Sequence, residues 1–146
     1  MTTATTHPVR DTAGDGDPGS DSLLRVALRA DATLCGGLGL IIAMAADPLS
    51  RVSGLSATSE WIGGAALVGY GAALFLAAGA PDVRRVGIGV LVGNIVFALV
   101  VAAVLATGLL PLTEAGVVGI AGFTAVTLAF AYAQYLGVRH LMSTPS

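Results

Sequence analysis

The stretch VGIGVLVGNIVFALVVAAVLATGLL, residues 86–110, contains 25 residues and no charged side chain. A helix rises 1.5 Å per residue, so about 20 residues cross the roughly 30 Å hydrocarbon core of a bilayer. Strands that cross membranes are instead about 10 residues long and alternate apolar with polar side chains. The stretch therefore predicts a transmembrane helix, and it guides the interpretation of the rest of the chain.

Three other segments are comparably apolar, and the four predicted spans cover residues of about 23–46, 61–80, 86–110 and 115–138. We predict an all-α fold, an integral membrane four-helix bundle in up-down-up-down order, formed by residues 22–140. Residues 1–21 are rich in Gly, Pro, Thr and Asp and have too little apolar surface to order themselves, which predicts a disordered cytoplasmic tail. Residues 141–146 are predicted to form a short C-terminal tail.

Composition narrows the class of protein further. Of the 146 residues 11% are charged, whereas soluble domains carry roughly 25%. The net charge is −2 and no basic patch occurs, so we expect no nucleic-acid partner. The chain has one cysteine, which excludes an internal disulfide. Its lack of lysine and its abundance of Ala, Gly and Val are typical of a high-GC bacterial genome, so we expect a bacterial plasma membrane location.

The arginines predict the orientation in the membrane. Positive side chains gather in the cytoplasmic loops of membrane proteins. One side of the predicted bundle carries five arginines near its spans, while the loops on the other side carry only Arg51. The five are Arg25, Arg29, Arg84, Arg85 and Arg139. We therefore predict that both termini are cytoplasmic.

The connections between the spans differ in length. PDVRR (81–85) and PLTE (111–114) are so short that the spans they join should pack as antiparallel neighbours. The remaining connection, DPLSRVSGLSATSE (47–60), is predicted to be either a short helix on the membrane surface or a plain loop. Pro48 is expected to end the first span, and Thr58 or Ser59 is expected to cap the second.

Few polar residues lie within the spans, and such residues are candidates for function. Asp31, near one edge of its span, Asn94 and Gln134 fall in the predicted cytoplasmic half of three helices, where we expect them to face the interior and share hydrogen bonds. Thr127 and Tyr70 are added to this candidate cluster. The cluster fits three roles: bonds that join helices, a ligand cavity open to the cytoplasm, or proton or ion coupling through Asp31.

Two neighbours of the acid on the same helix allow other interpretations. Asp31 could pair with Arg29 or with a lipid headgroup instead of joining the cluster. Cys35, four residues from Asp31, is interpreted as a small packing residue.

Glycine is the other conspicuous feature of the spans, with 20 residues in the chain. Small residues let membrane helices approach closely, and GVLVG (89–93) has the small-xxx-small spacing. The predicted packing glycines are Gly36, Gly64, Gly89, Gly93 and Gly119. Their packing is either within one bundle or, through the glycines of GVLVG, between the copies of a dimer.

Several chemistries are excluded by what the sequence lacks. The two histidines, His7 and His140, cannot face each other across helices, so a bis-His haem site is not expected. No Glu-x-x-His pair occurs for a di-iron site, and no Ser-His-acid set lies within reach of one site. We therefore expect no metal, no cofactor and no enzymatic activity.

Five stretches resemble a group of small, uncharacterised four-span membrane proteins common in actinobacteria. They are LRADATLCGGLGL (28–40), DPLSRVSGLS (47–56), VGNIVFALV (92–100), PLTEAG (111–116) and FAYAQYLGVRH (130–140). The resemblance covers roughly residues 24–140 and implies a four-helix bundle with no known activity, in which Asp31, Asn94 and Gln134 match recurrent polar positions. Phe97 departs from the group, where Trp is common near this position. A more distant likeness to DoxX-type four-helix proteins carries no specific motif.

These observations favour a non-enzymatic membrane protein that acts as an accessory or scaffold subunit and packs through glycine-rich helix faces. Its expected partners are the lipid bilayer and either further copies of itself or a larger membrane complex. The alternative is a small-solute transporter or ligand-binding bundle with a cytoplasm-side polar site at Asp31, Asn94 and Gln134.

Overall fold

The computed structural model describes residues 18–143, all helical apart from the turns between helices. The helices are α1 (Pro18–Met44), α2 (Ala46–Ser53), α3 (Ala57–Ala77), α4 (Val83–Thr107) and α5 (Glu114–Ser143). Four of them contain segments long and apolar enough to cross a membrane: Ser22–Met44, Ala57–Ala77, Val83–Thr107 and Glu114–Arg139. This confirms the all-helical prediction with four apolar spans. Most of the expected N-terminal tail, residues 1–17, lies outside the described residues.

Local capping explains where the helices differ from the hydropathy-based boundaries. The second span is capped by Ser56, whose hydroxyl accepts a hydrogen bond from the Ser59 amide at 3.1 Å. The prediction that Thr58 or Ser59 caps it is therefore wrong, and α3 begins earlier than expected. At the other end of the third span, Gly108 adopts a left-handed conformation with φ +63° and ends α4 before the apolar run is finished.

The connection after the first span is a helix rather than a loop. Pro48 does not end α1, which stops at Met44, but lies in the first turn of α2, where a missing N–H is tolerated. Gly54, at φ +86°, ends α2 in the left-handed conformation that glycine adopts most readily. The short-helix alternative for residues 47–60 is therefore correct for the first part of that connection.

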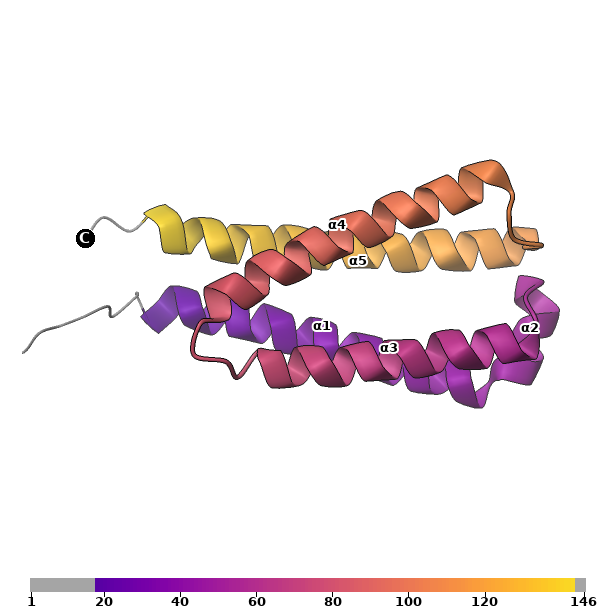
Figure 1. Cartoon of the computed structure of the whole chain (residues 1–146), viewed down its shortest axis with the longest axis horizontal. Coiled ribbons are helices and arrows are strands. Elements are labelled where there is room, and N and C mark those ends of the chain that lie inside the picture. Colours follow the sequence, from indigo (N-terminus) through magenta and orange to yellow (C-terminus); the bar gives the residue numbers. More distant parts are fainter. Residues whose placement is uncertain (1–17, 144–146) are drawn as a thin grey trace, which may run out of the picture.

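The long helices form two pairs, α1 with α3 and α4 with α5, and α1 also contacts α5 (Figure 1). The described chain begins and ends at one end of the bundle, and α2 lies at the other end (Figure 1). We call the two parts of the bundle the terminal half and the α2 half. α3 and α4 diverge after the short turn that joins them (Figure 1), so the expectation that they pack as antiparallel neighbours is wrong.

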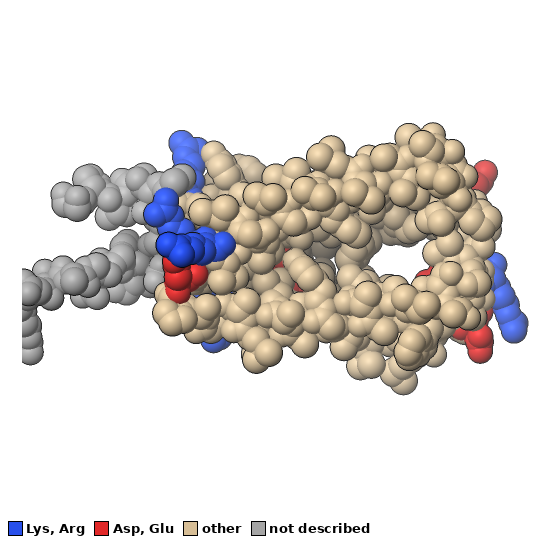
Figure 2. Space-filling model, in the orientation of Figure 1, with Lys and Arg blue, Asp and Glu red and all other residues tan. Residues whose placement is uncertain are grey.

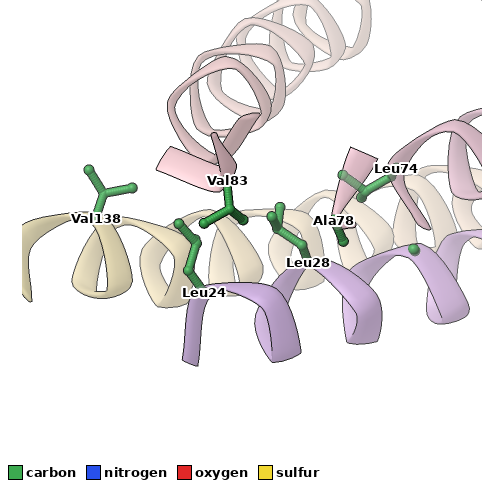
Figure 3. Close-up of a cluster of buried hydrophobic side chains, with 7 residues drawn as sticks. Leu24, Leu28, Leu74, Ala78, Val83 and Val138 are labelled. Carbon is green, nitrogen blue, oxygen red and sulfur yellow. The ribbon is translucent and has the colours of Figure 1, made fainter. Parts of the chain in front are cut away.

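An apolar core closes the terminal half. Leu24 and Leu28 of α1 are fully buried and point toward Val83 at the start of α4 (Figure 3). Leu74 and Ala78 from the end of α3, together with Ala32 and Val138, complete this cluster. All four long helices meet here, because each contributes at least one residue to the cluster.

Three glycines allow the close contact between α1 and α3. A Cβ atom on Gly64 would lie 2.5 Å from the Ala43 amide nitrogen and 2.6 Å from the Gly39 carbonyl oxygen. Cβ atoms on Gly39 and Gly71 would meet backbone of the opposite helix at 2.6 to 2.9 Å. Since backbone atoms cannot move aside as a flexible side chain can, only glycine fits at these positions.

The α2 half is joined at its far end by α2 and the start of α5. The Thr113 amide donates to the Ser53 carbonyl at 2.9 Å, and the Thr113 hydroxyl donates to the Val52 carbonyl. Ser53 also donates a hydrogen bond from its hydroxyl to Glu60 of α3, whose side chain is buried. Between these contacts and the middle of the bundle, an opening separates the α1–α3 pair from the α4–α5 pair (Figure 2).

Candidate functional site

The buried acid Asp31 is the end of a hydrogen-bonded chain in the middle of the bundle. It lies at the midpoint of α1 and is only 2% exposed, so its side chain faces the interior of the bundle. One carboxylate oxygen accepts from the Gln134 side-chain amide at 2.9 Å. The other accepts from the Cys35 thiol at 3.4 Å, because residues four apart share one face of a helix.

Two more helices extend this chain away from the acid. The Gln134 side-chain oxygen accepts from the Asn94 amide at 3.4 Å, which links α5 to α4. The Asn94 oxygen in turn accepts from the Tyr70 hydroxyl of α3 at 3.3 Å. The structure thus brings Asp31, Asn94, Gln134 and Tyr70 together, one from each long helix. We call these four residues and Cys35 the polar cluster.

Every donor in the polar cluster points toward Asp31. The Tyr70 hydroxyl donates to Asn94, Asn94 donates to Gln134, and Gln134 donates to the carboxylate. Both carboxylate oxygens of Asp31 accept in these bonds, so the acid ends the chain of donors. Among the described residues, no buried side-chain nitrogen or oxygen lacks a partner. The three bonds between helices join all four long helices. Each such bond contributes roughly 0.6 to 2 kcal/mol to the stability of helix packing in a membrane.

Among residues 18–143, no arginine pairs with Asp31. Arg29 stacks over the Phe75 ring of α3, with its guanidinium carbon 5.9 Å from the ring centroid. Arg25 donates to the Ala78 carbonyl at 2.7 Å and so ties α1 to the end of α3. The alternative in which Asp31 pairs with Arg29 is therefore wrong, and the partners of the carboxylate are neutral.

Thr127 does not join the polar cluster. Although it is buried and lies on the same face of α5 as Gln134, its hydroxyl donates to the Phe123 carbonyl of its own helix at 3.1 Å. Next to it, Phe123 meets Phe97 of α4 edge-to-face, with ring centroids 5.9 Å apart. Apolar aromatic contact, rather than hydrogen bonding, therefore joins α4 and α5 at this level.

Two polar contacts were not expected from the sequence. Cys35 donates to Asp31, and the signal for this was the four-residue spacing on one helix, which we interpreted as packing. The bond from Ser53 to Glu60 joins α2 to α3, and no local pattern indicates it because it depends on the turn between the two helices. Both contacts involve short side chains that suit either packing or bonding.

The predicted packing glycines divide into two groups. Gly64 packs tightly against α1, and the backbone of Gly36 lies 2.7 to 2.9 Å from the Cβ position of Gly71. A Cβ on Gly36 would itself meet no atom within 4 Å, so Gly36 contacts α3 through its backbone only. Gly89, Gly93 and Gly119 likewise have no atom within 4 Å of a Cβ position, and their backbone is not among the atoms nearest the Cβ position of another described glycine, so the expectation of packing at these three is wrong for this single chain. Their faces are open to the surroundings of the bundle.

The chain was compared with protein families, with curated proteins and with solved structures, and none of the three comparisons found a match. The resemblance to the small four-span group therefore stays a prediction.

Proposed function

We propose that the protein is a non-enzymatic membrane subunit that packs against a partner helix through the outer face of α4. The observation that carries this proposal is the open stripe at Gly89 and Gly93, where a Cβ would meet no atom within 4 Å. By contrast, Gly39, Gly64 and Gly71 are all in close contact within the chain. Small residues at helix interfaces permit close backbone approach, which drives association in lipid.

The exposure of α4 supports the same proposal. Of an apolar 18-residue stretch of α4, 6% is buried within the chain, against 17 to 28% for the corresponding stretches of the other three spans. Lipid covers an apolar surface just as effectively as another helix does, so the exposure of α4 alone does not require a partner. The combination of an exposed helix with an unused small-xxx-small face favours a second helix, from another copy or from a different subunit.

Changing the glycine face tests this proposal. We expect Gly89→Leu with Gly93→Leu to release the partner and to reduce the mass of the complex purified in mild detergent. Ala102→Leu is the matched control, because Ala102 is also exposed on α4 and lies nine residues, or about two and a half turns, from Gly93 on the opposite face. A wild-type chain that purifies only as a monomer with no partner would remove the main support for the proposal.

We also propose that the protein lies in the plasma membrane with both termini in the cytoplasm. Arginine side chains gather at the terminal end of the bundle (Figure 2), which supports this orientation under the positive-inside rule. Replacing Glu114, which is exposed at the α2 end, with cysteine should allow labelling from outside the cell only. The native Cys35 is buried and should give little background. Labelling only from inside would contradict this orientation.

A second candidate function is a ligand-binding or transport bundle centred on the polar cluster. The observation that favours it is a buried carboxylate whose partners are all neutral, since acids within a membrane protein often mark a pathway. Asn94→Leu separates the candidates. Loss of an uptake or binding phenotype with unchanged thermal stability would favour the site, whereas loss of thermal stability alone would favour a structural role.

A further inference from the structure

A surface cavity of about 450 Å³ lies at the α2 end, where the end of α1 meets the starts of α2 and α3. Ala43 and Met44 form its apolar side, and Asp47, Thr58 and Trp61 supply its polar and aromatic side. Ligand sites commonly have volumes of about 300 to 1,000 Å³. The cavity shares no residue with the polar cluster or with the glycine face of α4, so neither proposed function uses it.

Two of the lining side chains suit an ammonium group. Asp47 is exposed in the first turn of α2, and its carboxylate makes no ion pair or hydrogen bond with the described residues, where the only ion pair joins Arg85 to Asp82. The Trp61 indole is 57% exposed and lies on the neighbouring helix. A carboxylate attracts a cation directly, and an indole face attracts it through the cation–π interaction.

The third side of the cavity favours a ligand that carries both charges over a simple cation. The first turn of α3 contributes Ala57 and Thr58, whose backbone N–H groups have no helical partner because they begin the helix. The N–H groups at this end of α3 carry a partial positive charge that favours an anion, while the Glu60 carboxylate in the same turn is engaged by the Ser53 hydroxyl. A ligand that carries a phosphate and an ammonium a short distance apart meets both walls favourably, whereas a simple amine or a simple phosphate meets only one.

The position of the cavity indicates where such a ligand comes from. Trp61 begins the second apolar span, and tryptophan is enriched at the interface between hydrocarbon and water. Met44, at the end of the first span, is 80% exposed, so the apolar side of the cavity continues onto surface that lipid chains cover. A headgroup attached to acyl chains fits this arrangement better than a free solute does.

We propose that this cavity binds the zwitterionic headgroup of an aminophospholipid of the phosphatidylethanolamine class. The ammonium lies between Asp47 and Trp61, and the phosphate lies at the first turn of α3. The proposal goes beyond the subunit function, because a lipid held at the α2 end would select the membrane environment of the bundle without using α4.

The single tryptophan of the chain reports binding directly. The full chain in detergent is titrated with dihexanoyl-phosphatidylethanolamine and, separately, with dihexanoyl-phosphatidylglycerol, which lacks the ammonium. We expect a saturable change in Trp61 emission with an affinity about tenfold higher for the ethanolamine lipid, the effect of one charge-assisted contact. Equal affinities for the two lipids would overturn the proposal.

Two variants locate the effect within the cavity. Asp47→Asn should lower the affinity for the ethanolamine lipid about tenfold without weakening the binding of the glycerol lipid. Glu114→Gln is the matched control, because it removes an exposed acid from the same end of the bundle but outside the cavity, and it should change neither affinity. An equal response of the two variants would overturn the assignment of Asp47.

Two further measurements complete the test. Native mass spectrometry of the same samples counts retained lipid independently of fluorescence, and no preference for the ethanolamine lipid there overturns the proposal even if the emission is silent. Free phosphoethanolamine at the same concentrations should not saturate the emission change, because it lacks the acyl chains. Binding of the free compound as tight as that of the lipid would show that the lipid source is wrong.

Discussion

In the terminal half, all four long helices converge on Leu24 and Leu28, whereas in the α2 half an opening separates the two helix pairs (Figures 2 and 3). The terminal half is closed by apolar side chains and, toward the middle of the bundle, by the polar cluster. The α2 half is closed only at its far end, where Thr113 bonds to the end of α2. α1 and α3 therefore form the continuous part of the fold, while α4 and α5 are attached to this pair at two levels.

The largest expected effect comes from breaking the α1–α3 pair, which both halves share. Gly64→Val places side-chain atoms against the backbone of Ala43 and Gly39, which cannot yield, and should cost more than about 3 kcal/mol of unfolding free energy. Gly63→Val is the control, because a Cβ on Gly63 meets nothing within 4 Å. Thermal unfolding in detergent measures both, and equal stability of the two variants would contradict the packing.

The second-largest effect on stability is expected in the core of the terminal half. Leu28→Ala removes a fully buried side chain from the core of the terminal half and should destabilise the bundle by about 3 kcal/mol. Leu99→Ala, on the 66% exposed Leu99 of α4, should change the unfolding free energy by no more than about 0.5 kcal/mol. Denaturant titration of both variants tests this difference, and similar losses would contradict the assignment of Leu28 to a packed core and of Leu99 to an exposed face.

A smaller effect concerns the polar cluster between the two halves. Gln134→Leu leaves a carboxylate oxygen of Asp31 and the Asn94 amide without their partner and should cost about 2 kcal/mol. Thr127→Val on the same face of α5 removes only a bond within one helix, so its cost should stay near 0.5 kcal/mol. If the two variants have the same melting temperature, the cluster does not hold the helices together.

The smallest effect is expected at the far end of the α2 half. Thr113→Val removes the hydroxyl that bonds the Val52 carbonyl and accepts from the Gly116 amide, at a cost of about 1 kcal/mol. Distances between spin labels on α2 and α5 should also lengthen, because this contact closes the opening. Thr107→Val, whose hydroxyl bonds only carbonyls of α4, should leave the label distances unchanged. Unchanged distances in the Thr113 variant would show that another contact closes this end.

Much of the fold could be predicted from hydropathy, because long uncharged runs report on each helix separately. Boundaries were less accurate where capping decides them: Ser56 and Gly108 act through one hydrogen bond and one φ angle, which a hydropathy window does not detect. The pairing of helices was partly wrong for a similar reason. A short turn brings two helix ends together, but the faces of α3 and α4 decide whether the helices stay in contact.

The candidate site shows the same division. Polar residues at depth could be found from the sequence, because Asp31, Asn94 and Gln134 interrupt apolar runs. Their order in the chain of bonds could not be found, since it depends on the distances between helices. Cys35 and Thr127 bond within their own helices, but a four-residue spacing alone does not show whether a side chain packs, bonds its own helix or reaches a neighbouring one. The orientation in the membrane and the function stay predictions.

By itself, the sequence determined that this protein has four long apolar helices, because apolar length along the chain is a local property and bilayer thickness sets its scale. It also determined which side chains are too polar for hydrocarbon. Only the tertiary structure decided which glycines touch backbone, since Gly63 and Gly64 are neighbours in sequence but face different surroundings. The tertiary structure also decided the partners of Asp31. A helix points each side chain in a different direction, and the neighbouring helices determine which groups lie there.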